Sequence, residues 1–166
     1  MDDLTAHEHQ NGLYLTPEGF KALHDELDHL TVVKRPEIAE RIRESLQHGE
    51  FSEDNSELDE VKFEQAMVEN RIAELKTIFG TAQMLDKTTI PVDYVGIGSV
   101  VKIEDRDFPD EFEVRIVASI EADPSRDLVS MESPLGSALM GRKQGDYVEF
   151  YAPEGKKNYT ILDISR

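Results

Sequence analysis

The residues with the most evident chemistry lie in one short polar segment of the chain. Between Gly49 and Ser56 the sequence supplies three carboxylates, at Glu50, Glu53 and Asp54. Carboxylate oxygens are hard ligands of the kind that Mg²⁺ prefers. Acids at an exposed turn also serve solubility and helix capping, since negative charge is favourable near a helix N-terminus. The residue types alone therefore leave a metal role and a purely structural role open.

A long helix is predicted before this segment. Thr16 followed by Pro17 and an acid is a strong helix start. Apolar residues then recur at spacings of three and four, at Phe20, Leu23, Leu27, Leu30, Val33, Ile38, Ile42 and Leu46. Pro36 lies inside this stripe, so we expect it to bend the helix without ending it. The helix is predicted to end near Gly49.

A second helix is predicted to begin around Asn55 and Ser56, both good N-caps. Its stripe has the spacing of a coiled-coil seam and consists of Leu58, Val61, Gln65, Val68, Ile72, Leu75 and Phe79. Two such stripes joined by a short link bury each other by folding back. The pattern predicts an antiparallel hairpin with arms roughly 40 Å long, and it puts the acidic segment at the tip.

The helical spacing of apolar residues ends after Gly80. Pro91, Gly96 and Gly98 then mark a linker. Strands are predicted at 99–103, 111–117, 128–131, 147–151 and 159–164, with one short helix from Ser133 to Gly141. The expected fold is α+β, with an N-terminal antiparallel coiled-coil hairpin and a C-terminal antiparallel β domain. The predicted divisions are a tail at 1–13, the hairpin at 14–86, a linker at 87–97 and the β domain at 98–166.

Composition narrows the function classes. A formal charge of −17 argues against general phosphate-backbone binding, which needs clustered cations. The absence of cysteine excludes thiolate metal sites and cysteine nucleophiles. No apolar run is long enough to span a membrane and no secretory signal is visible, so a cytoplasmic location is expected. One cationic cluster, at Lys34, Arg35, Arg41 and Arg43, is either a weak nucleic-acid patch or ordinary solvated helix surface.

Several groups of residues carry a family resemblance. In the predicted hairpin they are Arg35-Pro36-Glu37-Ile38, Gly49 with acids at 50 and 53, Asn55, Gln65 and Arg71-Ile72. In the second half they are Ser133-Pro134-Leu135-Gly136, Ala138-Leu139, Gly141 and Lys143-Gln144-Gly145-Asp146. With these motifs the sequence resembles the Gre family of bacterial transcript-cleavage factors, from Leu15 to Ile164.

The resemblance implies a protein that is not itself an enzyme. An FKBP-like C-terminal domain would dock at the rim of the secondary channel of bacterial RNA polymerase, through Ser133, Pro134, Leu135 and Gly136. The hairpin would enter the channel and bring Glu50 and Glu53, with Asp54 as a further ligand, to the polymerase's Mg²⁺ and the 3′ end of the nascent RNA. The polymerase would then hydrolyse its backtracked RNA. The free protein would not hold Mg²⁺ stably, and neither a membrane nor a small-molecule substrate is expected.

The tip departs from the family pattern, Gly-Asp-Leu-x-Glu-Asn. Glu50 replaces the Asp, Phe51 replaces the Leu, and Asp54 is one residue extra. Counting from Gly49 keeps Glu50 and Glu53 as the acids, whereas counting back from the second helix selects Phe51 and Asp54. The first register is favoured because Phe51 cannot bind a metal. Two other functions are weighed: a channel-binding regulator that inhibits without efficient cleavage, and an FKBP-like isomerase or chaperone.

Overall fold

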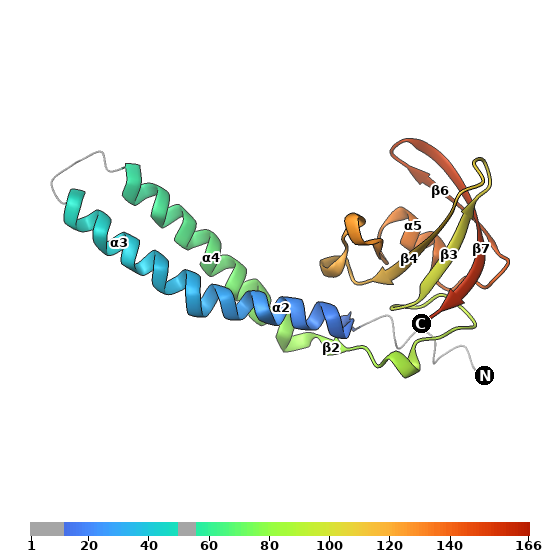
Figure 1. Ribbon diagram of the computed structural model, residues 1–166, viewed down its shortest axis with the longest axis horizontal. Coiled ribbons are helices and arrows are strands. Elements are labelled where there is room, and N and C mark those ends of the chain that lie inside the picture. Colours follow the sequence, from blue (N-terminus) through green and yellow to red (C-terminus); the bar gives the residue numbers. More distant parts are fainter. Residues whose placement is uncertain (1–11, 50–55) are drawn as a thin grey trace. The chain divides into compact units, whose positions relative to one another are not determined.

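The computed structural model describes residues 12–49 and 56–166 (Figure 1). The chain divides into two compact units. One is helical and comprises Phe20–Ala82. The other comprises the residues before Phe20 together with Gln83–Arg166, and it contains the larger β-sheet.

The helical unit has two long arms. The first arm consists of α2 (Pro17–His29), a π-helical turn (Leu30–Lys34) and α3 (Arg35–Gly49), and the second arm is α4 (Ser56–Thr81). In Figure 1 α4, in green, runs back alongside the first arm, in blue. The predicted start of α2 is confirmed, because the Thr16 hydroxyl accepts a hydrogen bond of 3.0 Å from the Gly19 amide. The predicted antiparallel hairpin is confirmed as well.

The predicted bend at Pro36 takes the form of a π-helical turn. Proline has no amide hydrogen to donate to the carbonyl four residues before it. In the turn just ahead, the Arg35 amide instead donates to the carbonyl of Leu30, five residues back. Such a turn holds one residue more than an α-helical turn, so it shifts the phase of all that follows.

The phase shift corrects part of the predicted apolar stripe. Val33 and Leu46, both expected to be buried, are 47% and 48% exposed. Ile38 is buried as predicted, and Ser45, which was not part of the predicted stripe, is buried as well. On α4, the buried residues are Val61, Ile72, Leu75 and Ile78, so Ile78 is buried in place of the predicted Phe79. Phe79 packs edge-on against Phe20 at 5.2 Å between ring centroids.

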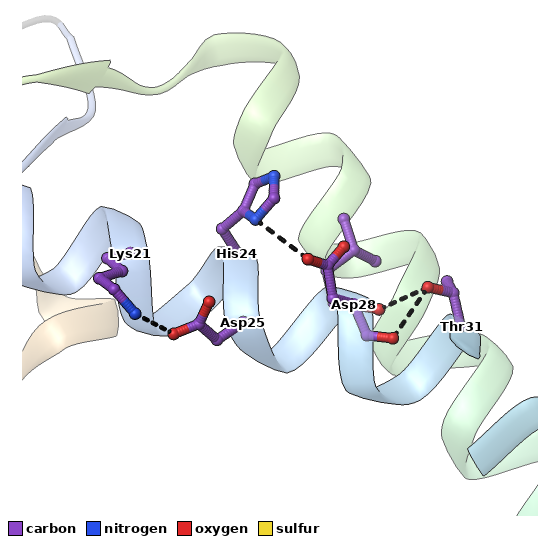
Figure 2. A network of polar contacts seen from close by, with 6 residues as sticks. Lys21, His24, Asp25, Asp28 and Thr31 are labelled. Carbon is purple, nitrogen blue, oxygen red and sulfur yellow. Dashed lines mark hydrogen bonds and ion pairs between the residues drawn. The ribbon is translucent and has the colours of Figure 1, made fainter. Parts of the chain in front are cut away.

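Polar contacts follow the exposed side of α2 as it approaches the π-helical turn (Figure 2). They include two side-chain contacts between residues four apart. Lys21 forms an ion pair with Asp25 at 2.6 Å, and the His24 ring nitrogen Nδ1 lies 3.5 Å from the Asp28 carboxylate. Thr31 lies within the π-helical turn, and its hydroxyl donates to main-chain carbonyl oxygens three and four residues back, at 3.2 and 2.9 Å. This hydroxyl gives those carbonyls an additional partner where the helix changes pitch.

The larger sheet has five strands in the order β5-β4-β3-β7-β6. Their bounds are β3 Val100–Asp105, β4 Glu111–Val117, β5 Leu128–Ser130, β6 Tyr147–Ala152 and β7 Gly155–Ser165. Helix α5 (Pro134–Leu139) packs on one face, and its Leu139 is fully buried in the core. The central strands β3 and β4 supply Val101, Ile103, Val114 and Ile116 to this core, which is why these strands alternate between apolar and polar residues.

The predicted α+β fold is confirmed, with one difference in the sheet. The sheet is antiparallel except that β5 runs parallel to β4. The ten residues between these strands form two short 3₁₀ helices, Ser119–Glu121 and Pro124–Arg126, in place of a tight hairpin turn. A connection of this length carries the chain back, so that β5 starts at the same end as β4.

A small second sheet was not predicted. β1 (Tyr14–Leu15) pairs in parallel with β2 (Gln83–Met84), and both strands belong to the unit that contains the larger sheet. Leu15 is fully buried at this pairing. Two residues are too few for any alternation to be seen in a sequence.

Candidate functional site

The three acids of the predicted tip, Glu50, Glu53 and Asp54, lie outside the described residues. The helix ends on either side of them are described: α3 ends at Gly49 and α4 begins at Ser56. The acidic segment therefore joins the ends of the two arms in the chain, as predicted. Within 12–49 and 56–166, no group of three or more His, Asp or Glu side chains could hold a metal ion.

The cationic cluster is engaged in ion pairs. Arg35 makes a bidentate pair with Glu69, at 2.8 Å for both bonds, and Arg41 pairs with Glu64 at 2.6 Å. Lys34 also approaches Glu64, at 4.0 Å, and Arg43 pairs with Glu40 on its own helix. Three of the four cations thus bridge the first arm to α4. This arrangement favours a role in holding the two arms in register, and the nucleic-acid role stays a prediction.

A further ion pair joins the two arms at the end away from the acidic segment, nearer in the chain to the unit that contains the larger sheet (the β unit). Arg71 of α4 donates two hydrogen bonds, of 2.6 and 3.0 Å, to the Glu26 carboxylate of α2. These bonds hold the pKa of Glu26 below its ordinary value of 4.5 and raise the pKa of Arg71. Both side chains are more than a third exposed, so the pair contributes at most about 1 kcal/mol.

This pair gives the hairpin a pH dependence. Because the pKa of Glu26 is lower in the folded state, its contribution is present above pH 4.5 and is lost as the pH falls through the folded-state value. We expect the melting temperature, followed by the helical circular dichroism signal, to fall between pH 5 and pH 2. Glu26→Gln should show a smaller fall over the same range. An identical pH profile for the two proteins would contradict this role of Glu26.

The predicted docking residues lie together at the start of α5. The Ser133 hydroxyl accepts from the Gly136 amide at 3.0 Å and donates to the Ser130 carbonyl at 2.7 Å. Gly136 is buried, and a Cβ built on it would overlap that same carbonyl oxygen. Leu135 packs against the core, whereas Pro134 is exposed. Ser133, Leu135 and Gly136 therefore build the turn that presents Pro134 at the surface.

Two polar residues beside this turn were missed by the sequence analysis. The Ser119 hydroxyl donates to the Glu132 carboxylate at 2.7 Å and contacts the Ser130 hydroxyl at 2.7 Å. Glu132 is exposed and immediately precedes Ser133. Ser119 is eleven or more residues away in the chain, so its part in the turn could not be read from spacing.

Both halves of the chain match models of transcription elongation factors. Residues 13–84 match the transcription elongation factor N-terminal model, and residues 90–166 match the GreA/GreB C-terminal model. The class of the protein is therefore that of a transcription elongation factor. The chain belongs to the GreA/GreB family, which confirms the predicted resemblance and the predicted function class.

Individual relatives agree with this assignment. The chain is 48% identical over 152 residues to transcription elongation factor GreA of Clostridium kluyveri, covering 92% of this chain and 95% of the relative. It is 46% identical to GreA of Clostridium botulinum, covering 92% and 94%. Among solved structures it is similar to GreA factor homolog 1 of Thermus thermophilus, with 29% identity, coverage of 94% and 100%, and a TM-score of 0.43.

Membership of this family implies an interaction with RNA polymerase, whose own cleavage activity such factors stimulate. None of the helices in the described part of the chain is long and apolar enough to cross a membrane.

Proposed function

We propose that this protein binds bacterial RNA polymerase through the secondary channel and stimulates cleavage of backtracked nascent RNA, so that arrested elongation complexes resume synthesis. The observation that carries the proposal is the GreA similarity of 48% over 92% of the chain. The paired arms that lead to an acidic segment support it, because they give those acids a long and narrow carrier. Such a factor acts in the cytoplasm, where the polymerase works.

Glu50 and Glu53, with Asp54 as a further ligand, are proposed to complete a Mg²⁺ site that belongs to the polymerase. Their donor set fits the ion, since Mg²⁺ prefers oxygen ligands and binds through one or two protein carboxylates while keeping several waters. Bound there, Mg²⁺ supplies charge neutralisation and an activated water for phosphodiester hydrolysis. The chain's own contribution is to place the carboxylates and to hold a proton acceptor near that water. The 3′ end of the nascent RNA is the proposed substrate of the complex.

Docking is proposed to use the turn of Ser133, Pro134, Leu135 and Gly136. The exposed Pro134 would contact the rim of the channel, and the other three would hold it in place. The cationic cluster of Lys34, Arg35, Arg41 and Arg43 would bind RNA only by giving up its carboxylate partners. We therefore propose that the polymerase, and not this cluster, supplies most of the contacts to nucleic acid.

A second candidate function follows from the altered tip. Glu50, Phe51 and the extra Asp54 differ from the pattern of the family at the residues expected to do the chemistry. If these changes misplace the carboxylates, the protein would occupy the channel and slow the polymerase without efficient cleavage. Shortening of labelled RNA in a halted polymerase complex separates the two. Cleavage supports the first function, and inhibition of elongation without shortening supports the second.

The free protein should not cleave RNA. An exposed group of carboxylates lacks the enclosed metal site and the cationic phosphate clamp that hydrolysis requires. Incubation with labelled RNA and Mg²⁺ should leave the RNA intact for as long as the polymerase is absent. A defined cleavage product from the free protein, lost in Glu53→Ala, would show instead that the chain has an active site of its own.

A further inference from the structure

The first turn of α2 is held by a carboxylate that lies far away in the chain. The main-chain amide of Thr16 donates to Glu121 at 2.9 Å, and the Thr16 hydroxyl donates to the same carboxylate at 2.5 Å. Thr16 is only 5% exposed. Glu121 ends the 3₁₀ helix that follows β4, and all of these residues belong to the unit that contains the larger sheet.

These bonds form a relay into the helix. The Thr16 hydroxyl donates to Glu121 and accepts from the Gly19 amide, so each bond polarises the next. A carboxylate at a helix N-terminus is also favoured by the helix dipole. Gly19 leaves room for the carboxylate, because a Cβ at this position would overlap it. We call the three residues Thr16, Gly19 and Glu121 the clasp.

A second contact supports the clasp. Lys87, which follows the hairpin in the chain, pairs with Glu18 of the same helical turn at 2.8 Å. This contact holds the pKa of Glu18 below its ordinary value. The pair is more exposed than the clasp and therefore weaker. The hydrogen bonds to the buried Thr16 are the stronger restraint on this turn.

We propose that Glu121 is a positioning residue for RNA cleavage, acting through Thr16 on the base of the helical arm. This inference rests on the proposed function. Helix α2 continues without a break from the clasped turn to His29, and it leads through α3 toward the acidic segment. A rotation of about 2° at the base moves a point roughly 40 Å along a helical rod by more than about 1 Å. A displacement of that size can lower a geometry-dependent rate by about a hundredfold.

The test compares Glu121→Ala and Gly19→Ala with wild type and with Glu113→Ala, an exposed acid on β4. Gly19→Ala is informative because alanine favours a helix more than glycine does, yet its Cβ displaces the Glu121 carboxylate. In single-turnover RNA shortening by halted polymerase, both clasp variants should lose about tenfold or more in maximal rate. The factor concentration that gives half-maximal rate should change less than about twofold, since the docking turn is untouched. Glu113→Ala should match wild type.

A second measurement does not depend on cleavage. The chain has no cysteine, so Asn70→Cys and Asp163→Cys allow selective spin labelling of one exposed position in each unit. The distance distribution between the labels should broaden when Glu121→Ala or Gly19→Ala is added. An unchanged distribution, or equal loss of maximal rate and apparent affinity, would overturn the positioning role. Failure of wild type to shorten RNA would reject the proposed function, and the label distances would then decide on the clasp alone.

Discussion

Glu53→Ala should abolish stimulated RNA cleavage while binding to the polymerase persists. Removing Glu53 takes away one of the proposed Mg²⁺ ligands, whose position should determine the rate, so losses of about a hundredfold or more are expected. Glu50→Ala should give a loss of similar size. The measurement is single-turnover shortening of labelled RNA in a halted complex, with binding measured by competition against labelled wild type.

The register of the tip can be tested by the same assay. Glu50 carries one methylene more than the Asp of the family pattern, and the extra Asp54 lengthens the segment. If the two changes compensate each other, Glu50→Asp alone should lower the rate, and Glu50→Asp with Asp54 deleted should restore it, so that the effects are not additive. Asp59→Ala, in the first turn of α4, is the matched control for charge. Unchanged cleavage in the Glu50→Ala and Glu53→Ala variants would show that the acidic segment is ordinary solvent-exposed charge with no part in cleavage.

Gly136→Ala should destabilise the β unit and weaken docking together. The added methyl group meets a backbone carbonyl oxygen that is fixed by the Ser133 hydroxyl, so it cannot be accommodated by a side-chain movement. Overpacking of this kind costs roughly 1–3 kcal/mol. Thermal unfolding should show a melting temperature lower by several degrees.

Pro134→Ala is the matched control for the same turn. Pro134 is exposed and occupies the first position of α5, where its ring makes no main-chain hydrogen bond. This variant should keep nearly all of its thermal stability and lose affinity for polymerase. If Pro134→Ala binds as tightly as wild type, the docking contact lies elsewhere on the β unit.

The sequence predicted the parts of the fold that follow a regular period. The two arms were predicted because their apolar stripes are long, and the strands β3 and β4 because they alternate cleanly. The error at Val33 and Leu46 has a definite cause. A proline signals a disturbance of the helix, but it does not say whether the chain bends or adds a residue to one turn, and the added residue changed the buried face.

In the candidate site, too, residues in local runs were predicted and residues with distant partners were not. The acidic segment and the turn at Ser133 could be proposed from the sequence because each is a local run of residues. Glu121 was not found, since its partner Thr16 is 105 residues away and nothing local marks it. The extra length of β7, from Gly155, was hidden by polar residues that an edge hairpin tolerates. Contacts between distant residues needed the three-dimensional structure.

The pairing of β1 with β2 makes the helical unit an insertion. Leu15 and Met84 are partners in this small sheet, so the chain leaves the sheet-containing unit and returns to it at neighbouring positions. The loop closed by that pairing is the whole helical unit, and loop closure costs depend only weakly on loop length. Because β1 and β2 run parallel, a connection of about a dozen residues or more could replace 20–82 and leave the remaining fold intact. Evolution or an engineer could lengthen, shorten or exchange the hairpin while the sheet-containing unit stays as it is.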